Sequence, residues 1–501
     1  MLRWALLVAL FAAGLGTRGC NVATSFNHPD EPIAVGLNRW LDRSWDTNWK
    51  QASLPPEFDY PQYNFSSYHY AVHLWAKVAA PVLPGAWSTE RNGVVLLRAF
   101  SVLCAALAVV WTFLLGEKLG GWGTGLAAAA LVLVNPQLVA DGHYARAEAM
   151  LTWLTLVVVW LAWCQDRWTW RWRLGVTAAL VGFMIAAKVT LGLMVVVPLW
   201  VAWQAARQLT GEPARAARFA VGAVAAVGLT VAGFALGAPG ALGHPGAFLS
   251  GVQVLANQYG GFHPPHSEID GSIVAPALGR FYVATVGWVA LALGVAAAGH
   301  WIRRGNWAAL LLLALPFVTY VAYFAGKRVF FERNLSHVLP LGLLLVGAGA
   351  VWLASQLVRA AGRGRGLVAA LILAVAAAPG AAVTGLLLFR SLSGADPRVS
   401  LQCQRDVRAR YPGIEWRPIS LIFPEDLALL RRNFARDHKP VLVQFPEFND
   451  SYSRHYREEM ERQFVTYDAG QSDEALSYLP CSTLTVYHGP RTVYKVITGN
   501  R

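Results

Sequence analysis

A short polar stretch near the start of the chain, Asn27–Pro32, carries side chains suited to acid–base chemistry. It contains His28 and the adjacent carboxylates Asp30 and Glu31, just after an apolar segment. Carboxylates in such a place act as general bases or as metal ligands. They also cap helices, and Pro32 suits a first helical turn. The stretch therefore predicts a catalytic pair, a helix N-terminus, or both.

A second polar cluster, Asp141–Glu148, separates two apolar segments. Its candidate site residues are His143, Tyr144, Arg146 and Glu148. Ionisable groups at a membrane boundary are costly to place there, and they often take part in function. The alternative for Arg146 is a structural one, in which its long side chain extends from an apolar stem to the aqueous interface.

A single lysine, Lys188, interrupts the long apolar tract Ala178–Trp203. If the chain turns at this point, Lys188 lies at the outer surface of the membrane. If the tract forms one helix, the ammonium group is buried in the bilayer and needs a partner. Both arrangements make Lys188 a candidate site residue.

A basic cluster lies between two later apolar segments and contains Lys327, Arg328 and Arg333. In the topology derived below, this cluster faces outward, against the usual excess of basic residues in cytoplasmic loops. Arginine binds phosphate oxygens in a bidentate manner. The cluster therefore suits a phosphate group at the level of the lipid headgroups.

A weaker pattern, His263–Asp270, contains His263 and His266, which are ligand types for a divalent metal. The alternative is a loop that lines the path of the substrate. Glu31 and His266 are the metal-ligand candidates, and the sequence leaves the need for a metal open. The chain contains no Walker A, G-x-S-x-G, zinc-type cysteine or H-E-x-x-H motif.

The composition shows what kind of scaffold must position these residues. Of 501 residues, 55% are hydrophobic and only 14% are charged. A soluble domain has about 25% charged residues, so the chain is predicted to be a multi-pass membrane protein. The net charge is +13, but it is spread over short loops rather than gathered in a basic tail. A nucleic-acid partner is therefore not expected.

Hydropathy predicts an α-helical membrane domain over residues 1–389, with about 11 transmembrane helices. The first, Leu2–Gly16, has the length of a signal peptide or a short anchor, and we favour a retained anchor. The other predicted spans are about 92–115, 122–140, 148–164, 174–187, 189–204, 219–237, 276–298, 307–325, 335–357 and 367–389.

Basic residues occur in every second loop of this series, which the positive-inside rule assigns to the cytoplasm. These residues are Lys118, Arg167, Arg171, Arg173, Arg207, Arg215, Arg218, Arg303, Arg304, Arg359, Arg363 and Arg365. The opposite, external side then holds the loop 17–91, Lys188, residues 238–275 and the C-terminal region. It also holds the polar cluster Asp141–Glu148 and the basic cluster with Lys327, Arg328 and Arg333. All candidate site residues therefore face the same side of the membrane.

The external loop 17–91 is predicted to lie along the membrane surface. Apolar residues recur at helical spacing, which indicates an amphipathic interfacial helix. They are Ile33, Leu37, Trp40, Leu41 and Trp45. An aromatic segment, Tyr60–Trp75, which includes the candidate Tyr63, is predicted to do the same.

Residues 390–501 are hydrophilic and predict a small external α/β domain. A helix is expected at Leu401–Arg410, and strands are expected at Ile419–Phe423 and Val441–Phe445. Cys403 and Cys481 both lie in this region. Outside the cytosol they can form a disulfide.

These motifs, taken in their order along the chain, resemble the GT-C superfamily of membrane glycosyltransferases. The nearest in style are bacterial members of the protein O-mannosyltransferase and aminoarabinose transferase group. The resemblance extends over roughly residues 1–357. It rests on His28-Pro29-Asp30-Glu31, Tyr60-Pro61, Arg98, Asn135-Pro136, Arg146, Glu148, Lys188, Arg333 and Leu339-Pro340.

The resemblance implies an enzyme that takes a sugar from a polyprenyl phosphate on the external face of the inner membrane. The acceptor would be a lipid, a glycan or a protein, and the anomeric carbon would be inverted. Asp30 would be the general base, and Glu31 would position the acceptor or bind a metal. The residues implied to hold the donor phosphate are Arg146, Lys188, Arg328 and Arg333. Relatives commonly have aspartate where this chain has Glu148, so its extra methylene changes where the carboxylate lies.

Two other functions are compatible with a polytopic chain. A transporter or flippase of a lipid-linked substrate is expected to have polar or helix-breaking residues near the midplane and an internal repeat. Here the polar groups gather on one face, which favours chemistry at the surface. A scaffold for envelope assembly would use Asp30 and Glu31 only as a helix cap. In every case membrane lipids are expected partners.

Overall fold

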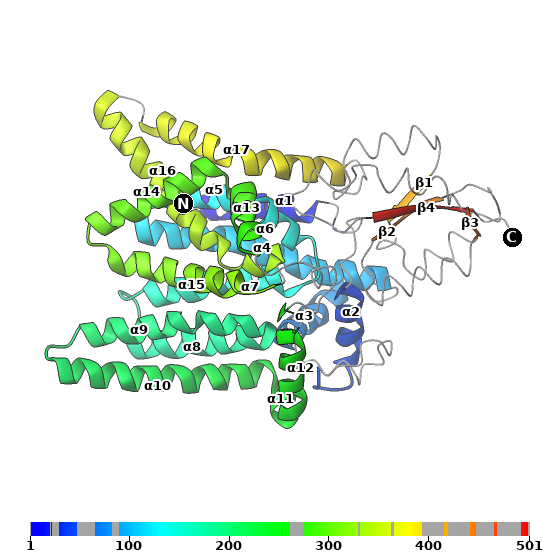
Figure 1. Cartoon of the computed structure of the whole chain (residues 1–501), viewed down its shortest axis with the longest axis horizontal. Coiled ribbons are helices and arrows are strands. Elements are labelled where there is room, and N and C mark those ends of the chain that lie inside the picture. The colour runs from blue at the N-terminus through cyan, green and yellow to red at the C-terminus, as the bar shows by residue number, and fades with distance from the viewer. Residues whose placement is uncertain are drawn as a thin grey trace.

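The computed structural model describes the chain over residues 2–20, 22, 30–47, 66–82, 90–257, 259–260, 274–328, 331–361, 365–392, 415–418, 432, 436, 441–446, 465–467 and 492–498. Within these residues the chain forms a bundle of α-helices with a small β-sheet beyond one end (Figure 1). The helices and the 3₁₀ segments, named η, are α1 (Leu2–Gly19), α2 (Asp30–Trp40), α3 (Ser66–Ala79), η3 (Ala80–Val82), α4 (Glu90–Gly120), α5 (Trp122–Leu133), α6 (Pro136–Gly142), α7 (Ala147–Trp163), α8 (Trp170–Ala187), η4 (Val189–Val195), α9 (Val196–Arg207), α10 (Glu212–Gly237), α11 (Pro239–Gly243), α12 (Pro245–Asn257), α13 (Val274–Val286), α14 (Trp288–Arg303), α15 (Trp307–Ala325), η8 (Glu332–Leu335), α16 (Leu339–Ala361) and α17 (Arg365–Leu392).

Several helices have the length and composition of membrane spans. In the described part of the chain six stretches qualify, and the bent pair α5–α6 makes a seventh. The six are Asn92–Gly120, Val189–Arg207, Glu212–Gly237, Trp307–Ala325, Leu339–Arg359 and Leu367–Gly385. Helices α7 and α14 are apolar but shorter. The helical, multi-pass membrane architecture is therefore as predicted, but these stretches alone do not reach the predicted count of about 11.

Two predicted spans, about 122–140 and about 276–298, are each two helices in the structure, and the first of them is the bent pair α5–α6. Hydropathy predicts a single helix over about 276–298, but α13 and α14 meet at Gly287 instead. The backbone of Gly287 has φ = 88°, a conformation that side-chain-bearing residues rarely adopt. The prediction of one continuous helix was wrong because hydropathy does not register a single residue with this backbone freedom.

Helix α8 is held against α10 by a close backbone approach. A Cβ atom on Gly182 would lie 2.0 Å from the carbonyl oxygen of Thr230, and one on Gly233 would lie 2.0 Å from that of Ala179. Only glycine fits at such a crossing, which is a common way to pack helices in membranes. This packing fixes the end of α8, where Lys188 follows.

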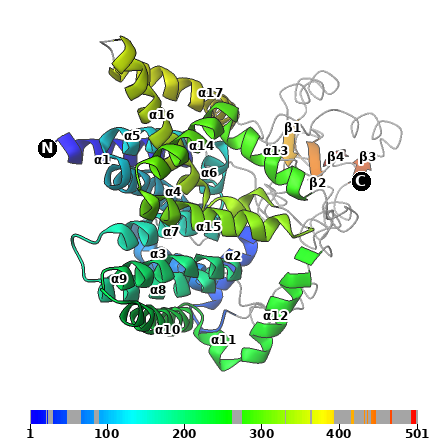
Figure 2. The ribbon, with the colours of Figure 1, turned by 60° about the vertical axis from the view of Figure 1, so that its left-hand side comes forward.

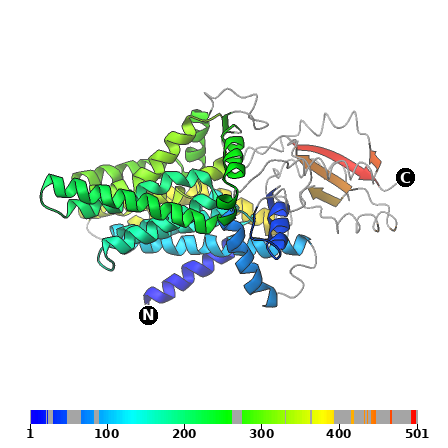
Figure 3. The ribbon, with the colours of Figure 1, turned by 90° about the horizontal axis from the view of Figure 1, so that it is seen from below.

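The predicted amphipathic helix is present as α2, and its place in the membrane interface stays a prediction. Helix α2 (Asp30–Trp40) crosses the sheet-side end of the bundle (Figure 3), and Leu37 and Leu41 are buried as predicted. Trp45, predicted on the apolar face, is 79% exposed because the helix ends at Trp40. Asn38 of α2 is also buried, with its Oδ1 3.1 Å from Nδ1 of His73 in α3.

The turns that join α9 to α10 and α14 to α15 lie at the end of the bundle away from the sheet, as do the end of α16 and the start of α17 (Figure 1). These are turns predicted to be cytoplasmic from their basic residues. The arrangement agrees with the predicted alternation of loops, and the cytoplasmic assignment of this end stays a prediction. Helices α11 and α12 run across the direction of the long helices, outside the bundle (Figure 2).

The C-terminal region contains a four-stranded sheet in the order β1-β2-β4-β3. Strand β1 (Glu415–Pro418) pairs in parallel with β2 (Val441–Pro446). Strand β4 (Thr492–Thr498) pairs antiparallel with β2 and with β3 (Val465–Tyr467). Strand β2 contains the predicted strand Val441–Phe445. The predicted helix Leu401–Arg410 and strand Ile419–Phe423 lie outside the described residues, so the helical part of this domain stays a prediction.

Asn135, Pro136 and Arg18 stabilise the bend of 64° between α5 and α6. Asn135 caps α6, because its Oδ1 accepts a hydrogen bond of 3.2 Å from the N–H of Leu138, and Pro136 occupies the first turn. The end of α5 leaves carbonyl groups without helical partners. Arg18 of α1 donates to two of them, Val132 at 2.8 Å and Leu133 at 3.3 Å.

Replacing Arg18 should therefore destabilise the protein. In Arg18→Met the carbonyl of Leu133 loses the guanidinium donor, and that of Val132 keeps only a long contact of 3.4 Å from the N–H of Asn135. Leaving a buried polar group unpaired costs about 1–3 kcal/mol. We expect a lower thermal unfolding midpoint in detergent micelles. The matched control is Arg3→Met, because Arg3 is exposed and pairs with Glu117 at the surface, where an ion pair contributes about 0–1 kcal/mol. Equal shifts in the two variants would contradict the role of Arg18.

Candidate functional site

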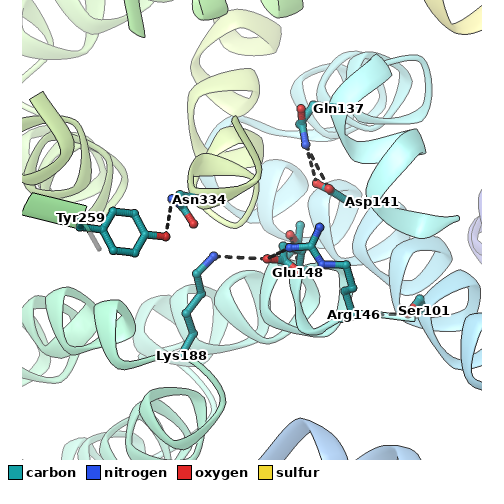
Figure 4. A network of polar contacts seen from close by, with 9 residues as sticks. Ser101, Gln137, Asp141, Arg146, Glu148, Lys188, Tyr259 and Asn334 are labelled. Atoms are coloured by element: carbon teal, nitrogen blue, oxygen red, sulfur yellow. Dashed lines mark hydrogen bonds and ion pairs between the residues drawn. The ribbon is translucent and has the colours of Figure 1, made fainter. Parts of the chain in front are cut away.

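The centre of the candidate site is the carboxylate of Glu148, which is 3% exposed (Figure 4). Its Oε1 lies 3.0 Å from Nη2 of Arg146 and 3.3 Å from Nζ of Lys188. Its other oxygen, Oε2, is buried and has no hydrogen-bond partner among the described residues. The structure therefore brings together three residues that the sequence analysis had selected from two separate motifs.

The local structure of the chain explains this arrangement. Arg146 is the N-cap of α7 in an extended backbone conformation, and Glu148 lies in the first helical turn. A carboxylate there is stabilised by the positive end of the helix dipole. Lys188 is also extended, and it joins α8 to η4. The break at Lys188 confirms the predicted turn, and the lysine is buried with Glu148 as its partner.

The segment η8 (Glu332–Leu335) adds a third cation to the cluster. Arg333 is half-buried over the ring of Phe331, with 4.3 Å from its Cζ to the ring centroid. It lies within electrostatic reach of Glu148 and Lys188. Arg328, which was also predicted to bind phosphate, is exposed at the preceding turn. The structure thus brings Arg333 to the cluster and leaves Arg328 at its edge.

Two residues that the sequence analysis did not select lie beside this cluster. Asn334 donates a hydrogen bond of 2.8 Å to the hydroxyl of Tyr259 (Figure 4). The carbonyl of Tyr259 accepts another, of 3.2 Å, from the backbone N–H of Arg328. Burial raises the pKa of Tyr259, so its hydroxyl stays protonated at neutral pH. Tyr259 lies in no recognisable motif, and the sequence carries no signal for it.

A second ion pair lies at the start of α2. Glu31 and Arg98 are both fully buried. The guanidinium donates two hydrogen bonds to the carboxylate, from Nε to Oε1 at 2.8 Å and from Nη2 to Oε2 at 2.7 Å. Oε1 also accepts a hydrogen bond of 2.7 Å from the N–H of Ala145. Glu31 thus has a buried guanidinium partner. It connects α2 to α4 and to the loop that precedes Arg146.

That loop also holds His143 and Tyr144. His143 is buried, and its Nε2 has no partner in the described part of the chain. Burial, followed by the positive charges of Arg98 and Arg18, lowers the pKa of His143 to about 4. The imidazole is therefore neutral at pH 7 and adds no charge to the site. Tyr144 is half-buried, and its carbonyl accepts a hydrogen bond from the N–H of Arg146.

Several predicted site residues lie outside the described residues. They are His28, Tyr63, His263, His266, Cys403 and Cys481. The backbone of Asp30 is described as the first residue of α2, but its side chain is not. Among the described residues no group of three or more His, Cys, Asp or Glu side chains is arranged to hold a metal ion. A divalent metal and the disulfide therefore stay predictions.

Removing the Glu31 carboxylate should destabilise the folded protein, and a second substitution at Arg98 should restore part of the lost stability. Glu31→Gln leaves the guanidinium of Arg98 buried without its counter-charge, and breaking such a pair costs about 3–5 kcal/mol. We expect a large fall in the thermal midpoint of the purified protein and partial recovery in Glu31→Gln/Arg98→Met. Asp42→Asn is the control, because Asp42 pairs with Lys77 at the surface. Additive losses in the double variant would show that the two residues do not interact.

Comparison with known proteins is informative at the level of the fold. No protein-family model and no curated protein matches the sequence. ArnT from Cupriavidus metallidurans, solved with bound undecaprenyl phosphate, is 12% identical with a TM-score of 0.51, over 100% of this chain and 97% of that one. The oligosaccharyltransferase of Archaeoglobus fulgidus in its apo form is 12% identical with a TM-score of 0.50, over 82% of this chain and 58% of that one. Both of these membrane glycosyltransferases have the GT-C fold. The chain has the same fold, as the resemblance predicted.

Proposed function

We propose that the protein is a membrane glycosyltransferase that moves a monosaccharide from a polyprenyl phosphate to a lipid, glycan or protein acceptor. The observation that carries this proposal is the convergence of Arg146 and Lys188 on the buried Glu148, with Arg333 in reach. Two guanidinium groups and one ammonium group are thus gathered around one buried carboxylate. In a water-poor environment such a site attracts an anion strongly.

The reaction explains why cations are needed. An acceptor oxygen or nitrogen attacks the anomeric carbon, and the bond from that carbon to the phosphate oxygen breaks. The acceptor proton passes to a base, and the electron pair of the broken bond goes to the phosphate. The leaving polyprenyl phosphate therefore gains negative charge as the bond breaks. Fixed cations stabilise that developing charge more than the starting diester, which lowers the barrier.

Arg146, Lys188 and Arg333 are the residues proposed to hold the phosphate, with Arg328 at the edge of the site. Glu148 keeps Arg146 and Lys188 in place through its Oε1. The longer side chain of glutamate, compared with the aspartate of relatives, allows one carboxylate to reach both cations. A guanidinium and an ammonium group also bind phosphate differently, since arginine offers a planar pair of donors and lysine a compact charge.

Asp30 is the residue proposed to take the proton from the acceptor. It directly precedes Glu31, and the ion pair of Glu31 with Arg98 fixes the start of α2. Glu31 then acts as a positioning residue rather than as a metal ligand. Positive charge close to a carboxylate keeps it ionised, as a general base requires.

The proposed location is the inner membrane, with the site and the C-terminal sheet on the external side. The alternation of basic loops supports this orientation. The proposed lipid partner is supported by the bound undecaprenyl phosphate of ArnT, which shares the fold. The sugar and the acceptor are left open.

Asp30→Asn tests the enzymatic proposal. A base contributes about 10²–10⁴-fold to the rate, so transfer from a radiolabelled polyprenyl-phosphate sugar should fall by at least about 100-fold. The unfolding midpoint should stay unchanged. Asp42→Asn, an exposed aspartate that follows α2, is the matched control and should keep full activity. Full transfer by a folded Asp30→Asn protein would show that Asp30 is not the base.

Lys188→Met tests the phosphate site separately. We expect free undecaprenyl phosphate to inhibit the variant at least about tenfold more weakly than the wild type, because a charge-assisted contact contributes about 1.5–3 kcal/mol. The control is Lys118→Met, since Lys118 pairs with the exposed Asp166. If the inhibition constant is unchanged, the phosphate binds elsewhere.

A further inference from the structure

Helix α6 carries a buried polar pair that the proposed mechanism does not use. Gln137 and Asp141 are 2% and 7% exposed. Nε2 of Gln137 donates to both carboxylate oxygens of Asp141, at 3.0 Å and 3.1 Å (Figure 4). The pair lies on the short helix that follows the bend after α5. A buried carboxylate and amide in an apolar bundle are costly, which points to a function.

The pair faces the cation cluster. Figure 4 shows the carboxylate of Asp141 beside Arg146 and Glu148, and both lie within electrostatic reach of it. The hydroxyl of Ser336, which is fully buried, lies beside the same carboxylate without completing a hydrogen bond of ordinary geometry. Asp141 therefore lies near the cation cluster, which is the place proposed for the phosphate.

Asp141 and its neighbours offer more hydrogen-bond acceptors than donors, even when the hydroxyl of Ser336 is counted as a donor. A carboxylate can accept about four hydrogen bonds, and Asp141 receives two from one amide group. Oε1 of Gln137 and Oε2 of Glu148 are buried acceptors without a partner in the described part of the chain. Buried acceptors are nearly always paired in proteins, so a ligand that brings donors is expected here. A phosphate brings none, and the charge of Asp141 repels it.

We propose that Asp141 and Gln137 form the sugar-binding subsite, in which hydroxyl groups of the donor's sugar ring donate hydrogen bonds to these acceptors. The inference rests on the proposed glycosyltransferase function. In such a donor the sugar ring is bonded directly to the phosphate, so the ring must lie beside the groups that hold the phosphate. The site is then divided into a cationic side for the leaving group and an acceptor side for the sugar. Both residues act in recognition, and neither takes part in proton transfer.

The test compares sugar use with phosphate binding in the full-length, reconstituted protein. The variants are Asp141→Asn, which keeps the shape of the side chain, and Gln137→Met, which keeps its length without the amide. Gln204→Met on α9 is the matched control, because α9 ends at the opposite side of the bundle. The probes are polyprenyl-phosphate mannose, glucose and aminoarabinose as donors, and free undecaprenyl phosphate as a competitive inhibitor.

We expect both variants to lower kcat/KM for the preferred donor by at least about tenfold, because a site that binds substrate hydroxyls discriminates through them. The order of preference among the three sugars should also change. The inhibition constant of free undecaprenyl phosphate should change by less than about twofold, since a loss of about 0.4 kcal/mol gives that factor. The control variant should behave like the wild type.

Other outcomes overturn the inference. Unchanged kcat/KM and unchanged sugar preference in both variants would exclude the subsite while leaving the glycosyltransferase proposal intact. Equal losses of donor use and of undecaprenyl phosphate binding would assign the pair to phosphate binding or to folding. If the wild type transfers sugar from none of the donors, the proposed function fails first, and this subsite fails with it.

Discussion

The buried ion pair between Glu31 and Arg98 is the contact on which the geometry of the site depends. Glu31 directly follows Asp30, and its Oε1 also binds the N–H of Ala145, which directly precedes Arg146. One carboxylate therefore sets the distance between the residue proposed as the base and a residue proposed to hold the phosphate. A bidentate pair is rigid as well as strong, because two parallel hydrogen bonds fix the orientation of both groups. An isolated charge in this position would be strongly destabilising, so neither partner can change alone.

The other charges inside the bundle also need partners of opposite charge. Arg146, Lys188 and Arg333 lie around Glu148, so cationic hydrogen-bond donors are concentrated at this place. The acceptors of Asp141 and Gln137 create the opposite imbalance a short distance away. A substrate with a phosphate at one end of a bond and hydroxyl groups at the other would satisfy both. The two imbalances are stable in the folded chain because each is held by a helix terminus or a bend rather than by a mobile loop.

The sequence predicted the local features well and the contacts between distant segments poorly. The order of apolar segments and the turn at Lys188 were correct, because hydropathy and motif spacing report on neighbouring residues. Arg146, Glu148 and Lys188, which were selected as site residues, lie together in the structure. The break at Gly287 and the exposure of Trp45 were missed, since each depends on where a helix ends. The partnership of Glu31 with Arg98 joins residues 67 positions apart, and no periodicity encodes it. Tyr259 was missed for the same reason.

The bend between α5 and α6 connects the first helix of the chain to the site. A helix that bends by 64° in a membrane leaves carbonyl groups that water cannot reach, and they must be paired inside the protein. Arg18 of α1 supplies those donors. The bend in turn directs α6, with Gln137 and Asp141, toward Glu148 rather than along the bundle axis. Helix α1 thus contributes a buried guanidinium to the folded bundle. Its position is coupled through two carbonyl groups to the side of the site that we assign to the sugar.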